Sequence, residues 1–136
     1  MPIVVDASMA AAWFLPDEQS EEADRLMAGL GADPARVPTL FWFEIRSLFV
    51  MAERRRRLRP GEASVVMAQL RAFPIVDGGG CDDGDVIALA GRRGLTGYDA
   101  TYLALALAER LPLATLDRRL AEAARAEGVA VLGPLV

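Results

Sequence analysis

Short apolar runs alternate with longer helical patterns along the whole chain. The apolar runs are brief, as expected for strands buried on both faces of a sheet. They cover residues 2–6, 36–38, 74–76, 113–115 and 129–132. Helical patterns lie between them, over residues 7–15, 20–30, 39–57, 60–73, 82–93, 98–110 and 118–127. This alternation predicts an α/β fold with a short, mostly parallel central sheet flanked by helices.

Proline and glycine mark the ends of several of these elements. Pro16 ends the first helical pattern, and Gly31 ends the second. Pro60 stands at an early helical position, where proline is tolerated. The 136 residues contain no internal repeat, low-complexity segment or interdomain linker. The sequence therefore predicts a single domain over residues 1–136.

The composition excludes several classes of enzyme. The chain has no His and no Lys, so all 15 basic residues are Arg. Without His, Ser-His-Asp and Cys-His hydrolases and His-zinc sites are excluded. Without Lys, P-loop NTPases, Schiff-base enzymes and protein kinases are excluded. Because Cys81 is the one cysteine, a disulfide within the chain and a cysteine-cluster metal site are excluded too.

Charge and hydropathy bear on partners and location. The net charge is −4 and the isoelectric point is near 4.8, which argues against a coat protein that binds nucleic acid through bulk charge. The N-terminal residues lack the basic region of a signal peptide. No apolar run approaches the roughly 20 residues of a membrane span. We therefore expect a cytoplasmic protein without membrane contact.

Four of the 19 acidic residues occupy positions that suggest a shared site. Asp6 ends the first strand, Asp117 follows the fourth strand, and Asp99 opens a helix that is apolar all round. The carboxyl ends of parallel strands meet at one edge of a sheet, where ligands bind. Glu44 falls within the apolar arc of the longest helix, where a carboxylate is costly to bury without a partner.

Each of these carboxylates also has a purely structural interpretation. Asp6 and Asp117 could cap the helices that follow them, and Asp99 fits a capping box that begins at Thr96. Glu44 could lie at the edge of the apolar arc and reach solvent. Gathered together, however, the carboxylates would repel one another unless cations neutralised them. Mg²⁺ or Mn²⁺ would suit such a site, because both prefer oxygen ligands.

The order of these motifs resembles the PIN-domain ribonucleases, and in particular the VapC-type toxins of bacterial toxin–antitoxin pairs. The resemblance spans essentially the whole chain, and its most specific segment is Tyr-Asp-Ala-Thr-Tyr-Leu-Ala-Leu-Ala. The matching parts are Val5-Asp6-Ala7-Ser8, Glu44 in a long helix, Leu95 to Ala106, and Leu113 to Leu120. The resemblance implies a PIN-like three-layer fold.

The resemblance also implies a metal-dependent endoribonuclease that hydrolyses RNA phosphodiester bonds through in-line attack by a metal-activated water. Asp6 and Asp99 would be the principal ligands of Mg²⁺ or Mn²⁺. Asp117 would bind the ion directly or through water, and Glu44 would hold a metal-bound water or a second ion. The hydroxyls of Ser8 and Thr115 would orient the carboxylates.

The chain departs from the family pattern just after Asp117. Many relatives have a further acid there, whereas this chain has Arg118 and Arg119. The number of bound ions therefore stays open.

The dense basic run is formed by Arg54, Arg55, Arg56 and Arg57. It could hold RNA phosphates near the acidic site, or it could be a solvated helix end that the helix dipole favours.

Aromatic residues concentrate on two of the predicted helices. At 100° per residue, Phe41, Trp42 and Phe43 cannot all face one core. We expect most of the aromatic side chains in the core and the rest in an exposed groove for a partner. The resemblance implies that such a groove holds the C-terminal segment of a VapB-like antitoxin, which inhibits the site, and that the toxin forms a homodimer.

Two other functions stay open. A PIN-like domain that binds RNA or protein without cleaving is expected if Asp6 or Asp99 lies apart from the other acids. A receiver-type phosphoacceptor matches the chain in length and in its alternation of strands and helices, but the absence of Lys argues against it. The sequence therefore favours the nuclease toxin.

Overall fold

The computed structural model describes residues 1–135. Its five strands form one sheet with the order β3-β2-β1-β4-β5, and every pair of neighbours is parallel. The strands are β1 (Val4–Val5), β2 (Ala35–Val37), β3 (Ile75–Asp77), β4 (Leu113–Ala114) and β5 (Val131–Leu132). The helices are α1 (Ala7–Ala12), α2 (Glu21–Gly29), α3 (Leu40–Arg54), α4 (Glu62–Arg71), α5 (Asp83–Arg93), α6 (Gly97–Glu109) and α7 (Arg118–Ala126), with a short 3₁₀ helix, η1 (Pro16–Glu18). The predicted α/β class is confirmed, and the sheet is parallel throughout.

The strand order reverses at β1. From β1 the chain builds outward through β2 to β3, and then returns to the other side of β1 to form β4 and β5. Val4 is therefore paired with Arg36 on one side and with Leu113 on the other. In parallel sheets a crevice opens beyond the carboxyl ends of the strands at such a reversal, and ligands bind in it.

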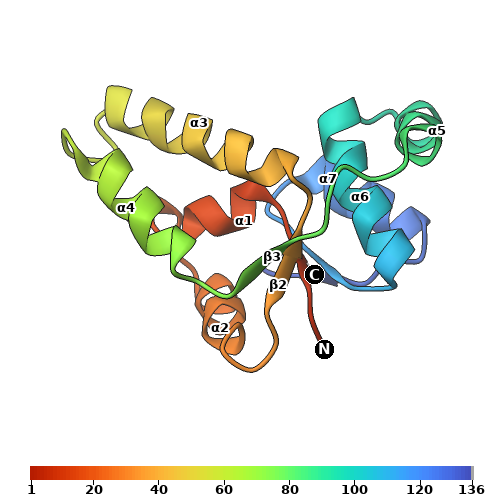
Figure 1. Ribbon diagram of the computed structural model, residues 1–136, viewed down its shortest axis with the longest axis horizontal. Coiled ribbons are helices and arrows are strands. Elements are labelled where there is room, and N and C mark those ends of the chain that lie inside the picture. The colour runs from red at the N-terminus through yellow and green to blue at the C-terminus, as the bar shows by residue number, and fades with distance from the viewer. Residues whose placement is uncertain (136) are drawn as a thin grey trace.

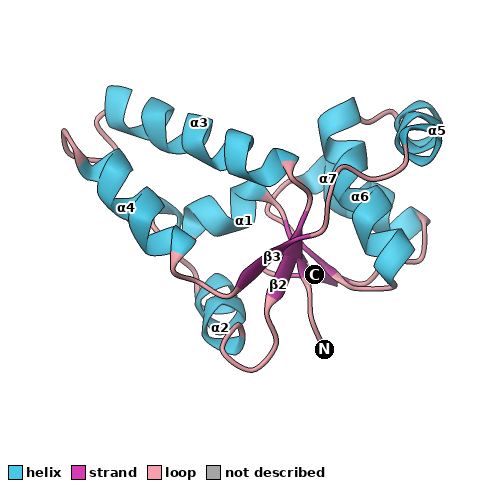
Figure 2. Cartoon of the chain, in the orientation of Figure 1, coloured by secondary structure: helices cyan, strands magenta, loops and turns pink. Residues whose placement is uncertain are grey.

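Helices enclose the sheet from both sides. In Figure 1, α1, α3 and α4 lie together on one side of the strands, and α5, α6 and α7 lie on the other. Figure 2 shows the short strands converging between these two groups. The largest fully buried side chains come from both groups and from the sheet, and include Met9, Phe41, Ile45, Phe49, Leu70, Tyr102, Leu103, Leu113 and Leu120. Within residues 1–135, no helix combines the length and the apolar character needed to cross a membrane.

The first strand and the first helix are both shorter than the sequence pattern predicts. The strand stops at Val5, because Asp6 serves as the N-cap of α1. The helix stops at Ala12 rather than at residue 15. Leu15 precedes Pro16 and has an extended backbone, since a following proline disfavours the helical conformation. Pro16 then begins η1.

The longest helix, α3, stops at Arg54 rather than at Arg57. Arg56 has a φ of 60°, a left-handed conformation that ends a helix. The Arg57 side chain turns back to Asp17 and Glu18, with nitrogen–oxygen distances of 2.6–3.0 Å. These bonds hold the turn after α3 against η1.

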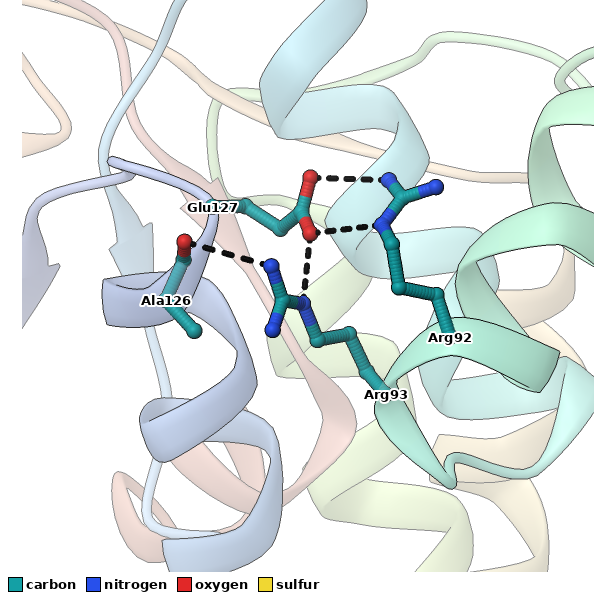
Figure 3. Close-up of polar contacts among 4 residues, drawn as sticks. All are labelled: Arg92, Arg93, Ala126 and Glu127. Carbon is teal, nitrogen blue, oxygen red and sulfur yellow. Dashed lines mark hydrogen bonds and ion pairs between the residues drawn. The ribbon is translucent and has the colours of Figure 1, made fainter.

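A carboxylate near the end of α7 ties this helix to α5. Both oxygens of Glu127 accept hydrogen bonds from Arg92, at 2.8 and 2.9 Å, and one of them also accepts from Arg93 at 2.5 Å (Figure 3). The Glu127 side chain is only 11% exposed. The two guanidinium groups lower the pKa of Glu127 to about 2.

Candidate active site

The four carboxylates that the sequence singled out line one cavity. The cavity has a volume of about 290 Å³ and lies where the carboxyl ends of β1 and β4 meet α3 and α6. Asp6, Glu44, Asp99 and Asp117 all contribute to its wall. The remaining lining residues are Ala7, Ser8, Ser47, Leu48 and Tyr102. The fold thus brings together residues that are up to 111 positions apart in the sequence.

Asp6 is the most buried of the four carboxylates, with 5% of its surface exposed. Its Oδ1 accepts hydrogen bonds from the Ser8 hydroxyl at 2.7 Å and from the Met9 backbone N–H at 2.9 Å. Its Oδ2 accepts from the Thr115 hydroxyl at 2.5 Å. Burial raises the pKa of Asp6 to about 6, although these hydrogen bonds oppose the shift. Asp6 therefore both caps α1 and faces the cavity.

The two hydroxyls that hold Asp6 also connect the ends of β1 and β4. The Ser8 hydroxyl oxygen accepts from the Leu116 backbone N–H at 3.0 Å. The Thr115 hydroxyl oxygen accepts from the Asp117 backbone N–H, also at 3.0 Å. Ser8 and Thr115 therefore lie where the sequence predicted, in contact with a carboxylate of the cavity.

Asp117 and Asp99 differ in how their side chains are held. Asp117 caps α7, because its Oδ1 accepts from the Leu120 backbone N–H at 3.0 Å. At the start of α6 the cap is instead Thr96, whose hydroxyl accepts from the Asp99 backbone N–H at 3.1 Å. Only this half of the predicted capping box forms, and the Asp99 carboxylate accepts no hydrogen bond from any described residue. It is therefore available to a ligand.

Burial and neighbouring carboxylates raise the pKa of Asp99. Burial is the larger cause, followed by the negative charges of Asp117 and Glu44. The positive charge of Arg119 opposes the shift. The predicted repulsion among gathered acids is thus present in this cavity.

Glu44 meets a partner that the sequence analysis did not assign. The Tyr102 hydroxyl donates a hydrogen bond to Glu44 Oε1 at 2.6 Å. Burial and this bond raise the pKa of Tyr102 well above its usual range, so the phenol stays neutral and donates. The sequence does indicate that Tyr102 is near the site, since Tyr102 follows Asp99 by three positions and so shares its helix face. A phenol in an otherwise apolar helix needs such a partner.

The negative charge of the cavity is not neutralised by an ion pair with any arginine of the described residues. None of the four carboxylates forms a salt bridge within residues 1–135. In this described part of the chain, no three Asp, Glu, Cys or His side chains already stand in an arrangement that could hold an ion. The donor set is nevertheless all oxygen and anionic, which fits Mg²⁺ or Mn²⁺ once the carboxylates close on an ion.

Comparison with known proteins decides the family. Residues 3–126 match the PIN domain. The chain belongs to the PIN-domain family. The resemblance drawn from the motif order is therefore confirmed.

Relatives of this PIN domain include a curated enzyme and two solved structures. Ribonuclease VapC3 from Pyrobaculum aerophilum is 38% identical over 132 residues, which cover 90% of this chain and 94% of that protein. The structure of PAE2754 from the same organism is 24% identical and has a TM-score of 0.73 over 96% of this chain and 83% of its own. A toxin–antitoxin complex from Klebsiella pneumoniae is 22% identical and has a TM-score of 0.55, with coverages of 85% and 86%. The two structures share the fold with this chain.

The basic run of the PIN domain lies away from the acidic cavity. Arg54 is ten residues beyond Glu44 on α3, a distance of about 15 Å along the helix axis. That end of α3 points away from the sheet and from α6 (Figure 1). Arg57 is also held by its two ion pairs. Arg119, in the first turn of α7, is the arginine whose charge reaches Asp99.

The aromatic side chains divide as predicted between the core and the surface. Phe41 is fully buried, whereas Phe43 is 59% exposed and has the Arg46 guanidinium 4.9 Å from its ring centre. Trp42 is half-buried beneath Arg71, whose guanidinium lies 3.8 Å from the ring centre. A groove of about 380 Å³ follows between α3 and α4, lined by Arg46, Phe49, Val50, Ala63, Ser64, Met67, Ala68 and Arg71.

Proposed function

We propose that this PIN domain, acting as a single domain over residues 1–136, is a metal-dependent endoribonuclease and the toxin of a toxin–antitoxin pair. The observation that carries the proposal is the cavity, where four carboxylates from four parts of the chain meet without a salt bridge from residues 1–135. The 38% identity to a VapC ribonuclease supports RNA as the substrate and phosphodiester hydrolysis as the reaction.

In this proposal Asp6, Asp99 and Asp117 hold Mg²⁺ or Mn²⁺, and Glu44 completes the site toward water or a second ion. The fit rests on the donor set of anionic oxygens. The pKa values of Asp6 and Asp99 are raised, and a bound cation would favour the charged form of both carboxylates. When bound, the ion supplies a water molecule of lowered pKa and stabilises negative charge on the phosphodiester oxygens.

The residues of the chain prepare this site. Asp6 accepts three hydrogen bonds, so the orientation of its carboxylate is set before any ligand arrives. Asp99 accepts none from the described residues, and it can turn toward an ion. Arg119, whose positive charge opposes the raised pKa of Asp99, is the arginine that we assign to pair with an RNA phosphate. The chain thereby binds and orients the scissile group while leaving the cavity open.

The partner that fits the groove between α3 and α4 is an antitoxin segment. The groove is mostly apolar, and Arg46 and Arg71 are among its lining residues, which suits an amphipathic peptide with acidic side chains. The fold likeness to a toxin–antitoxin complex supports this assignment. We expect the toxin to act in the cytoplasm, as a homodimer, and to be inhibited when the antitoxin covers the acidic cavity.

The test is induced expression of the wild type and of Asp99→Asn in a bacterial host. The asparagine keeps the shape of the side chain and leaves the Thr96 cap intact, but it loses the ligand charge. We expect the wild type to arrest growth and to yield discrete RNA fragments, whereas the variant does neither. If both proteins are folded and neither cleaves RNA, the function is binding without cleavage. The shared cavity argues against that alternative, which predicted that the acids lie apart.

A further inference from the structure

A buried phenol meets one of the four carboxylates of the cavity. The Tyr102 hydroxyl donates to Glu44 Oε1 at 2.6 Å, and the two residues lie 58 positions apart, on α6 and α3. Both side chains line the cavity, where Tyr102 is only 1% exposed and Glu44 is half-buried. We propose that Tyr102 is a positioning residue that fixes the Glu44 carboxylate for divalent-cation binding. This inference rests on the proposed nuclease function.

The chemistry of the pair favours this role. A neutral phenol has one proton to donate, and an ionised carboxylate is its strongest acceptor, so the bond is short and directional. From the described residues, Glu44 accepts this hydrogen bond and no other. Its Oε1 is therefore held by the protein, and its Oε2 is left for a ligand.

Glu44 needs such a restraint more than the other acids do. Asp6 and Asp117 are each fixed by a backbone N–H at a helix start. Glu44 is the fifth residue of α3, and its carboxylate accepts no hydrogen bond from a backbone N–H of the described residues. A glutamate side chain has three rotatable bonds, and a half-buried one can swing out to solvent. The hydroxyl of Tyr102 prevents this movement.

The bond also relates the positions of two acids. Asp99 and Tyr102 are three residues apart on α6 and lie on one face of that helix. The helix that presents Asp99 therefore also fixes Glu44 on the opposite wall. A cation that binds between Asp99 and Glu44 therefore meets two carboxylates whose relative position α6 has already set.

The experiment compares Tyr102→Phe with Tyr98→Phe. Tyr98, the other tyrosine of the chain, lies one turn earlier on α6 and is 64% exposed. Binding of Mn²⁺ is measured by titration calorimetry without RNA, and kcat and KM are measured with RNA. We expect Tyr102→Phe to weaken Mn²⁺ binding about tenfold and to lower kcat with little change in KM. We expect Tyr98→Phe to bind Mn²⁺ within about twofold of the wild type.

A double-mutant cycle separates positioning from a general structural effect. Glu44→Ala removes the carboxylate that Tyr102 holds. In that background we expect Tyr102→Phe to cause no further loss of Mn²⁺ affinity, because its effect passes through Glu44. A similar loss in both backgrounds would show that Tyr102 acts structurally, and it would overturn the inference.

A measurement on the wild type covers the case in which Tyr102→Phe does not fold. Protein labelled with ¹³C at the tyrosine ζ position gives two signals, which Tyr98→Phe assigns. Saturating Mg²⁺ should shift the Tyr102 signal and leave the Tyr98 signal in place. A Tyr102 signal that does not move overturns the inference.

Failure of this inference and failure of the proposed function give different results. If the wild type binds no Mn²⁺ and leaves RNA intact, both are wrong. If the wild type binds Mn²⁺ and cleaves RNA, and folded Tyr102→Phe matches it in Mn²⁺ affinity and kcat, only the positioning role is wrong.

Discussion

The hydroxyl of Thr115 lies 2.5 Å from Oδ2 of Asp6, a residue 109 positions earlier in the chain. This contact joins the residue after β4 to the residue after β1. The same hydroxyl oxygen accepts from the Asp117 backbone N–H. One fully buried threonine therefore sets the relative position of two carboxylates of the cavity.

Replacing Thr115 by valine should destabilise the protein and raise the pKa of Asp6 further. Valine keeps the shape but leaves a buried carboxylate oxygen without its donor, which costs about 1–3 kcal/mol of unfolding free energy. The pKa rises because the Thr115 bond opposes the effect of burial. Urea denaturation and NMR titration of Asp6 measure the two effects. Thr101→Val is the control, since its hydroxyl only bonds back to the Gly97 carbonyl of α6. Equal losses in both variants would contradict the prediction.

The metal-free protein should lose stability between acidic and neutral pH because of Asp6. Its pKa is about 6 in the folded state, against 3.8 for an ordinary aspartate. Between these values the folded state holds a proton that the unfolded state has released. The stabilising contribution is therefore complete below about pH 4 and is lost as the pH rises through 6, by at most about 3 kcal/mol.

The measurement is urea denaturation of the wild type and Asp6→Asn, with chelator present, across pH 4 to 7.5. The wild type should lose stability relative to the variant as the pH rises. A constant difference between the two proteins would show that Asp6 does not titrate in this range.

Glu127→Gln should destabilise the contact between α5 and α7. The variant loses the charge that both Arg92 and Arg93 meet (Figure 3), and we expect a loss of about 1 kcal/mol at pH 7. The pKa of Glu127 is lowered from 4.5 to about 2, so its contribution is present above 4.5 and is lost as the pH falls toward 2. Thermal unfolding at pH 7 and pH 3 should show the difference shrinking. Glu122→Gln, an exposed change on the same helix, should have no such effect.

Arg119→Glu should impair RNA cleavage more than Arg118→Glu. The two arginines are adjacent in the first turn of α7 and are both exposed, so their effects on the helix dipole are alike. Only Arg119 acts on Asp99. We expect kcat/KM to fall about tenfold for Arg119→Glu, which corresponds to about 1.4 kcal/mol, and by less than about twofold for Arg118→Glu. Equal effects of the two changes would place the RNA phosphates elsewhere.

The alternation of apolar runs and helical patterns predicts the fold class, and two physical arguments predict which residues line the cavity. Parallel strands bring their carboxyl ends to one edge, so Asp6 and Asp117 meet wherever the strand order places β1 beside β4. The apolar face of a helix predicts that Glu44 points inward. Neither inference requires knowledge of distances between residues in the folded structure.

The missed features depend on contacts between distant residues. The Arg57 side chain forms ion pairs with Asp17 and Glu18, about 40 positions away. The sequence around Arg57 does not predict these partners. The hydrogen bond from Tyr102 to Glu44 likewise requires the relative placement of α6 and α3. The end of α3 depends on the left-handed conformation of Arg56, a non-glycine residue that sequence propensity does not favour there.

Asp6 and Asp117 each begin a helix and face the cavity with the same carboxylate. At these two positions one side chain therefore serves both the start of a helix and the contact with a ligand. A lineage that lost its need for the cavity would still be selected to retain a capping side chain there, and the expected replacements are asparagine or serine rather than alanine. The Asp99 side chain is not needed as a cap, because Thr96 caps its helix. In descendants that no longer use the site, Asp99 should be the first of the three to vary.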